Sequence, residues 1–203
     1  MYNSKIALNH FVILHSKVQE RYKLQTEEQF INDLLNLKTQ NEAFRKLVVE
    51  YQKPLYTQIR NIVLNHDDTN DVLQNTFVKV YQNLKNFKGE SKLFSWMYRI
   101  ATNEAITHIN TKAKRNGNTP EAYQTKQIEN LVSDVYFDGN EIQLKLQKAI
   151  NILPAKQQLV FRMKYFQELK YEEISEVTGT TVGALKASYF HAVKKIEAFV
   201  LKN

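Results

Sequence analysis

Residues that break helices are sparse in this chain, and this scarcity constrains its fold more than any other feature. The 203 residues include only five glycines and three prolines. Between them, apolar residues recur at intervals of three and four, which places them on one face of a helix. No strand-like alternation of useful length is present, so we expect an all-α protein. The helices should end near Gly89, Gly117, Pro120, Gly139, Pro154 and Gly179.

Composition excludes several classes of protein. Cysteine is absent, which rules out disulfides, thiolate zinc sites and a cysteine nucleophile. The five histidines show no metal-ligand spacing, and no Ser-His-Asp order, phosphate-binding glycine loop or paired-carboxylate site stands out. No apolar run approaches the ~20 residues that span a bilayer. We expect a cytoplasmic protein that is not an enzyme, needs no cofactor or metal, and does not insert into membranes.

A change in composition divides the sequence into two helical domains. Between Asn116 and Gln143 there are five acidic residues and one basic residue, and apolar residues are few. We expect a flexible, solvated linker over 116–140, helical in part towards its end. It separates a first domain, residues 26–115, from a second domain, residues 141–203. Residues 1–25 form an N-terminal extension that no other prediction requires.

The second domain contains the pattern of a helix-turn-helix over residues 169–199. Gly179 is suited to the left-handed conformation that ends a helix. Thr180 or Thr181 then supplies the N-cap of the next helix, and Pro154 opens a preceding helix.

The last helix has two contrasting faces when it is laid out at ~100° per residue. Its core face is predicted to hold Leu185, Tyr189, Ala192, Ile196 and Phe199. The opposite side and its flanks carry small, cationic and aromatic residues, which suits a helix in the DNA major groove. The formal net charge of +7 also favours an anionic partner. An alternative is that this exposed face packs on another domain. The residues in question are Gly183, Lys186, Ala187, Phe190, His191 and Lys194.

The first domain contains an acidic helix start followed by an apolar stripe that begins at Val72. Asp68 or Thr69 is predicted to cap this helix, and acidic residues in a first turn favour the helix dipole. A second interpretation is a docking surface for a basic partner. Its exposed members would be Asp71, Gln74, Asn75 and Val78.

A basic, aromatic helix is predicted to begin near Leu93, after the loop 88–92. Trp96, Arg99 and Asn103 lie at i, i+3 and i+7 and so share a face. Residues 88–115 carry six basic and two acidic side chains. Aromatic, Arg and Asn side chains on one surface are typical of single-stranded nucleic-acid binding. The alternative is that Trp96 is a core residue.

Two separated stretches resemble the extracytoplasmic-function (ECF) sigma factors. Residues 71–77 (DVLQNTF), 87–91 (FKGES) and 94–103 (FSWMYRIATN) are similar to region 2 of that family. Residues 171–174 (YEEI) and 179–186 (GTTVGALK), with Leu153-Pro154 and Val160-Phe161 before them, resemble region 4. The resemblance covers about residues 40–112 and 142–200, with both regions in the family's order.

The resemblance implies a subunit that binds core RNA polymerase and directs it to promoter DNA, and in many members an anti-sigma factor is a further partner. By position, the polymerase-binding residues would be Asp68, Asp71, Gln74, Asn75 and Phe77, with Phe77 supporting the others. The residues that recognise and open the −10 element would be Lys88, Ser91, Lys92, Phe94, Trp96, Arg99 and Asn103. The residues that bind the −35 element would be Thr181, Lys186, Ala187, Ser188, Phe190, His191, Lys194 and Lys195.

The sequence departs from the family pattern at several positions. The family often has Arg at Ser188, His191 and Val193, Ser at Lys170, and Glu at Asn75. These departures imply weaker phosphate contact and the loss of one helix cap. A stand-alone helix-turn-helix regulator remains the alternative, although it leaves the acidic helix and the aromatic loop without a role.

Overall fold

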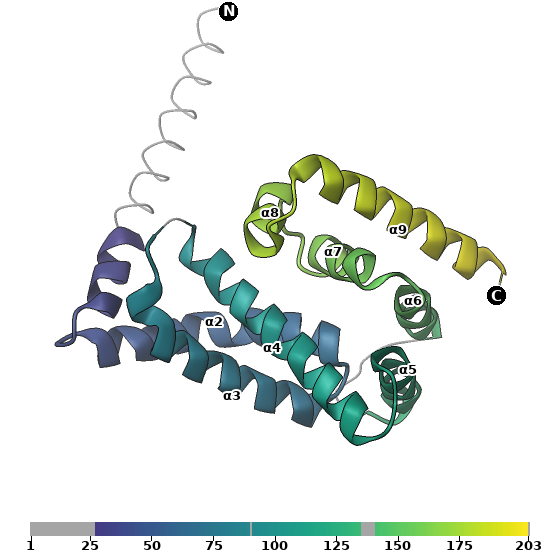
Figure 1. Cartoon of the computed structure of the whole chain (residues 1–203), viewed down its shortest axis with the longest axis horizontal. Coiled ribbons are helices and arrows are strands. Elements are labelled where there is room, and N and C mark those ends of the chain that lie inside the picture. Colours follow the sequence, from purple (N-terminus) through teal and green to yellow (C-terminus); the bar gives the residue numbers. More distant parts are fainter. Residues whose placement is uncertain (1–26, 90, 135–140, 203) are drawn as a thin grey trace, which may run out of the picture. The chain divides into compact units, whose positions relative to one another are not determined.

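The computed structural model describes residues 27–89, 91–134 and 141–202, and every regular element in these ranges is helical (Figure 1). The predicted all-α class is therefore confirmed. The chain divides into two compact units, one ending at Val48 and the other beginning at Val49, inside helix α2 (Gln40–Val63). No described helix is both long and apolar enough to cross a membrane. The predicted extension 1–25 lies outside the described residues.

A tight turn organises the unit that ends at Val48. Residues 27–35 are helical, and the Thr39 hydroxyl donates a hydrogen bond of 2.8 Å to the Asp33 carbonyl. This bond satisfies a carbonyl that the end of the helix leaves free. Leu34 and Leu47 are fully buried, so both helical segments of this unit have an apolar side.

Helix α3 (His66–Asn83) begins earlier than the sequence predicted. Its N-cap is Asn65, whose side-chain oxygen accepts a hydrogen bond of 2.9 Å from the Asp68 backbone N–H. The Thr69 hydroxyl bonds the Asn65 carbonyl at 2.5 Å. The predicted caps, Asp68 and Thr69, are thus inside the first turn. Asn65 replaces them because a side-chain oxygen at this position reaches the N3 donor.

Helices α3 and α4 (Leu93–Arg115) pack against each other and share a buried cluster with the second half of α2, and the 3-10 turn η1 (Leu84–Asn86) ends α3. Val72 of α3 shares one buried cluster with apolar residues of α2 and α4. At its centre the Gln58 amide donates to the Thr102 hydroxyl at 2.5 Å and to the Tyr98 carbonyl at 3.2 Å. These bonds satisfy polar groups that would otherwise be costly to bury. The α2 and α4 members are Leu55, Ile59, Ile62, Val63, Tyr98, Ala101, Ala105, Ile109 and Ala113.

The predicted linker contains ordered, buried structure. Helix α5 (Pro120–Asn130) is capped by Thr119, whose hydroxyl accepts from the Ala122 N–H at 3.2 Å. The turn η2 (Leu131–Ser133) follows it. Tyr123, Ile128 and Leu131 are buried, so the expectation of a solvated segment is wrong for 120–131. Residues 135–140 of the predicted linker lie outside the described residues.

The described range 141–202 contains the helices α6 (Glu141–Asn151), α7 (Ala155–Tyr165), α8 (Tyr171–Thr178) and α9 (Val182–Lys202). Pro154 stands at the N-cap of α7, one residue earlier than the predicted first position. Its fixed φ is compatible with either position. A buried cluster joins α6, α7 and α9, and it contains Ala149, Ile150, Leu153, Phe161, Ala192 and Ile196.

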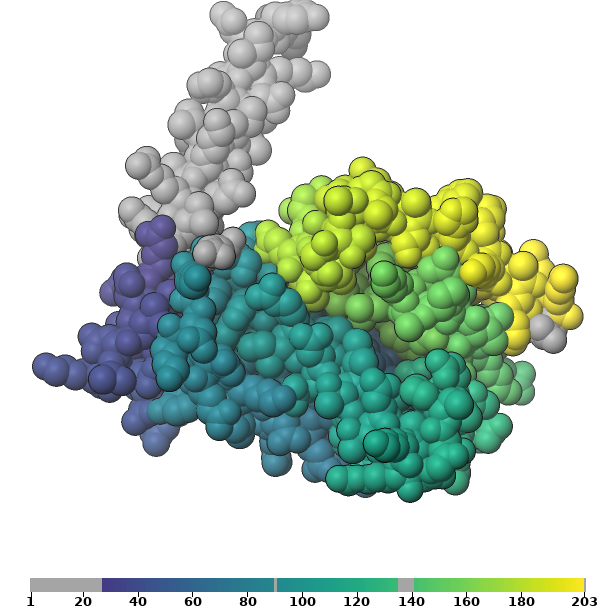
Figure 2. Space-filling view, in the orientation of Figure 1, coloured from purple at the N-terminus to yellow at the C-terminus, as the bar shows by residue number. Residues whose placement is uncertain are grey.

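Within the unit that begins at Val49, α8 packs against α4, and α7 packs against α8 and α9 (Figures 1 and 2). Val160, Met163, Ile174 and Val177 belong to the same buried cluster as Tyr98 of α4. Apolar burial of this kind is the main contribution to stability between helices.

Candidate nucleic-acid interface

The turn between α8 and α9 has the geometry that the sequence predicted. Gly179 ends α8 with φ 68°, in the left-handed region. Thr181 rather than Thr180 caps α9, because its hydroxyl accepts from the Ala184 N–H at 3.4 Å. At the start of α8, where Lys170 lacks a capping side chain, the Glu173 carboxylate accepts from the Lys170 N–H at 2.9 Å. Of the two hydrogen bonds of a capping box, the one from the N-cap backbone to the Glu173 side chain is therefore present.

The two predicted faces of α9 are present in the structure. Leu185, Ala192 and Ile196 are buried, while Tyr189 and Phe199 are half-buried. On the other side, Phe190 is 58% exposed. A large aromatic side chain at this exposure beside cations forms a surface able to contact base edges. Its exposed neighbours are Lys186, Ala187, His191, Lys194 and Lys195.

Local contacts order part of this exposed face. Lys186 Nζ lies 5.8 Å from the centre of the Tyr171 ring, and Lys164 Nζ lies 5.1 Å from the same ring. Such cation–π contacts restrain a flexible lysine. The contact between Tyr171 and Lys186 could not be predicted from a pattern of apolar residues, because only the folded chain brings the two side chains together. Ser188, another predicted contact, is half-buried.

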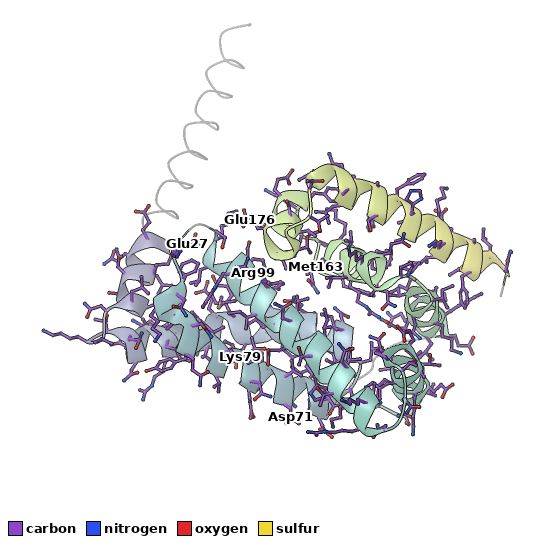
Figure 3. The ribbon with its side chains drawn as sticks, in the orientation of Figure 1. Glu27, Asp71, Lys79, Arg99, Met163 and Glu176 are labelled. Atoms are coloured by element: carbon purple, nitrogen blue, oxygen red, sulfur yellow. The ribbon has the colours of Figure 1, made fainter. Side chains whose placement is uncertain are left out.

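The loop before α4 and the start of α4 present a second basic surface. Lys88 and Lys92 are exposed, and Ser91 is half-buried. Phe94 is half-buried, and its ring centre lies 4.0 Å from that of Tyr98. Further along α4 the side chains of Arg99 (Figure 3) and Asn103 are exposed.

Trp96 does not share this surface. It is 9% exposed, and its ring centre lies 5.1 Å from that of Phe87. The alternative interpretation of Trp96 as a core residue is thus the correct one. The start of α4 is buried on several sides, since Leu93, Ser95, Met97 and Tyr98 are buried as well. A sequence pattern with one apolar face could not predict that the start of α4 is buried on several sides.

The residues of α3 that were predicted to bind polymerase also differ in their exposure. Asp71, Gln74 and Asn75 are exposed on α3, and Asp71 lies on the side of this unit away from α8 and α9 (Figure 3). Phe77 is half-buried against the core, which agrees with a supporting role. Asp68 is only 8% exposed, so its predicted place on a docking surface is wrong.

Asp68 instead joins α3, α4 and α5. Its carboxylate lies 3.3 Å from His108 Nε2 and 2.9 Å from Lys112 Nζ, and it accepts a hydrogen bond of 3.0 Å from the Tyr123 hydroxyl. The interaction with His108, followed by those with Lys112 and Tyr123, holds the pKa of Asp68 well below its usual range, although burial acts in the opposite direction. Burial and the carboxylate raise the pKa of Tyr123.

Residues of both predicted DNA-binding surfaces line one cavity of about 630 Å³. Arg99 and Asn103 of α4 contribute to it, and so do Thr180 and Ser188 from the helix-turn-helix. Lys92 Nζ, before α4, lies 4.0 Å from a carboxylate oxygen of Glu173 in α8. In the described ranges no group of three His, Asp or Glu side chains is placed to hold a metal ion.

Comparison with known proteins identifies both halves of this arrangement. Residues 47–115 match the family described as Sigma-70 region 2, and residues 143–196 match the family described as Sigma-70, region 4. The RNA polymerase sigma-H factor of Pseudomonas aeruginosa is 29% identical over 163 residues, which is 76% of this chain and 84% of that protein. The ECF RNA polymerase sigma-E factor of Haemophilus influenzae is 29% identical over 164 residues, or 77% of this chain and 86% of that protein.

Two solved structures share the fold. CnrH in complex with the cytosolic domain of CnrY has a TM-score of 0.65 at 17% identity, covering 87% of this chain and 98% of that chain. The sigma factor RpoE in complex with the anti-sigma factor NepR from Bartonella quintana has a TM-score of 0.57 at 17% identity, covering 77% and 96%. With regions 2 and 4 both matched in order, this chain belongs to the ECF family of sigma factors.

Proposed function

We propose that this protein binds core RNA polymerase in the cytoplasm, recognises the −35 and −10 promoter elements and promotes DNA opening. The observation that carries the proposal is the exposed face of α9, where Phe190 lies among cations opposite a buried apolar face. This is the arrangement of a helix that enters the major groove. The family matches extend over both helical modules, so they do not favour a stand-alone regulator.

In this proposal α9 reads the −35 element as duplex DNA. Lys186 and His191 bond purine edges. Phe190 contacts a thymine methyl group, because the small side chain of Ala187 lets α9 lie close to the bases. Lys194 and Lys195 contact phosphates, which fixes register without reading sequence. In the free chain Lys194 pairs with Glu197 at 3.1 Å and Lys195 bonds Gln157 at 3.1 Å. Both contacts are exposed and therefore weak enough to exchange for phosphate.

The loop 88–92 and the exposed side of α4 bind the opened −10 strand. Lys88 and Lys92 attract the phosphate backbone, and Arg99 and Asn103 contact bases. Unstacking a base costs a few kcal/mol, and stacking on an aromatic side chain returns ~1–3 kcal/mol per base. Phe94 is the available aromatic of this surface, while Trp96 supports it from within the core.

Polymerase binding falls to the exposed part of α3. Asp71, Gln74 and Asn75 form a polar surface supported from beneath by Phe77. The function is binding and not bond chemistry. An anti-sigma factor is a further proposed partner, since one of the similar structures, that of RpoE, is described as a complex with the anti-sigma factor NepR.

Run-off transcription with core polymerase on a genomic promoter library tests the proposal. We expect promoter-specific transcripts with the wild-type chain and a loss of about tenfold or more with Phe190→Ala, since each good base contact contributes ~1–3 kcal/mol. Tyr165→Ala is the matched control, because Tyr165 is similarly exposed at 52% but lies outside α9. If the chain neither co-purifies with core polymerase nor yields transcripts, the proposal is wrong.

A charge reversal on α3 tests the docking surface separately. Asp71→Arg should weaken association with core polymerase, because it reverses the charge of an exposed acid on α3. Glu129→Arg is the control, because it reverses another exposed acid, on α5. Equal effects of the two variants would show that only net charge matters and that α3 is not the docking surface.

A further inference from the structure

A second cavity, of about 230 Å³, lies where the end of α2 meets α4, α5 and α7. None of the residues assigned above to DNA or polymerase lines it. Its walls are mainly apolar, and Ile62, Ile106, Ile109 and Leu159 are among the residues that line it. The volume is below the ~300–1,000 Å³ of sites for drug-sized ligands, so it suits a small molecule.

Arg162 supplies the unusual feature of this cavity. The residue is 2% exposed and lines the cavity from α7. Its Nη1 donates to the Asn61 carbonyl and, at 3.0 Å, to Gln147 Oε1. Its Nη2 is buried without a hydrogen-bond partner among the residues that the structure describes. Burial lowers the pKa of Arg162 to about 10, so the group is still charged at neutral pH.

A buried guanidinium without a counter-ion is costly, and a carboxylate is the group that best matches it. The other polar residues of the cavity are less available. The Gln158 and Gln124 amides already donate to the carbonyls of Leu153 and Ile62. Lys156 and Glu121 are both exposed, and their opposite charges offset each other at the rim.

We propose that this cavity binds a small organic acid with an apolar chain, whose carboxylate accepts a hydrogen bond from Arg162 Nη2 while its chain contacts the isoleucines and Leu159. The walls come from α2, α4, α5 and α7. A ligand that fills them stabilises the packing of α7 against α4, because it binds only where these helices meet.

Titration calorimetry of the full chain with hexanoate tests the site, with hexanol and hexylamine as neutral and cationic probes of the same chain length. We expect hexanoate to bind, to raise the unfolding temperature, and to bind at least about tenfold more tightly than either analogue. Absence of binding at millimolar hexanoate would overturn the proposal. Equal binding of hexanol would also overturn it, since the guanidinium would then play no part.

Matched variants locate the binding. Ile106→Phe fills the cavity from a residue that is 40% exposed, whereas Ile142→Phe makes the same change at a 72% exposed position outside it. The first should abolish hexanoate binding and the second should leave it intact. Arg162→Lys keeps the charge and loses the forked geometry, so it should weaken hexanoate binding but not hexanol binding. Hexanoate binding that survives Ile106→Phe would show that the ligand binds elsewhere.

Discussion

Trp96 and Asp68 show how far its surroundings decide the role of a single side chain. Both were predicted to face a partner, and both are instead buried at 9% and 8% exposure. Trp96 packs on Phe87, and Asp68 bonds three side chains from α4 and α5. Neither environment could be inferred from sequence spacing, because the partners are brought close only by tertiary packing.

The burial of Trp96 predicts a defect in stability. Trp96→Ala should lower the free energy of unfolding by about 3–5 kcal/mol, the usual cost of removing a buried aromatic side chain. Arg99→Ala, on the exposed side of the same helix, should change it by less than about 0.5 kcal/mol. Urea unfolding of both variants checks this. If Trp96→Ala leaves the urea midpoint unchanged, Trp96 is not the core residue described above.

Asp68 predicts how stability depends on pH. Its pKa is lowered in the folded chain, so below the ordinary Asp pKa of about 3.9 the unfolded chain binds more protons. The stabilisation by Asp68 is therefore complete at neutral pH and declines as the pH falls. Asp68→Asn should cost about 1–3 kcal/mol at pH 7.

Urea unfolding at several pH values gives the difference in the free energy of unfolding between wild type and Asp68→Asn. This difference should be smaller by about 1 kcal/mol at pH 3 than at pH 7. Asp67→Asn, an exposed neighbour in the same turn, should show no such narrowing. A constant difference from pH 7 to pH 3 would contradict the assigned role of Asp68.

At the scale of the element, local patterns predicted what depends on local physics. The Gly179 turn, the Thr181 cap and the two faces of α9 follow from a few neighbouring residues and were predictable. Helix α5 was not, because its buried residues Tyr123 and Ile128 are too few and too widely spaced to show a helical period. Its position depends on contacts with α3 and α4, which are distant in the sequence.

The turn between α8 and α9 predicts opposite effects at two glycines. An added Cβ meets no atom within 4 Å at either Gly179 or Gly183, so only backbone conformation distinguishes them. Gly179→Ala should destabilise the chain by about 1–2 kcal/mol, because φ is positive there. Gly183→Ala lies within α9 and should stabilise it by up to about 1 kcal/mol. Thermal unfolding of the two variants checks this. If both substitutions shifted the unfolding temperature in the same direction, the assigned turn would be contradicted.

At the scale of the whole molecule, residues 49–203 form one compact unit in which α4 and α8 are in contact. Arg99 and Ser188, assigned to different promoter elements, line the same cavity of about 630 Å³. The labels −35 and −10 are positions along the promoter, so the two elements lie about 25 base pairs apart. At a rise of ~3.4 Å per base pair this is ~85 Å. Both surfaces cannot reach their elements while α4 and α8 remain packed together.

The packed unit should therefore open on core polymerase, and fluorescence energy transfer can measure this. The chain has no cysteine, so dyes at Lys85→Cys and Lys202→Cys, both exposed positions, are selective. Energy transfer should fall when core polymerase is added. A control pair at Lys85→Cys and Lys114→Cys, within one helical module, should not change. Unaltered transfer in the first pair would exclude opening.

The shared cavity of α4 and the helix-turn-helix has a consequence for how a cell would respond to surplus protein. A chain that holds its two base-contacting surfaces in one packed unit cannot bind both promoter elements before it meets the enzyme. Overproduction would then leave promoters unobstructed, and the excess molecules would compete with other initiation subunits for a limited pool of polymerase.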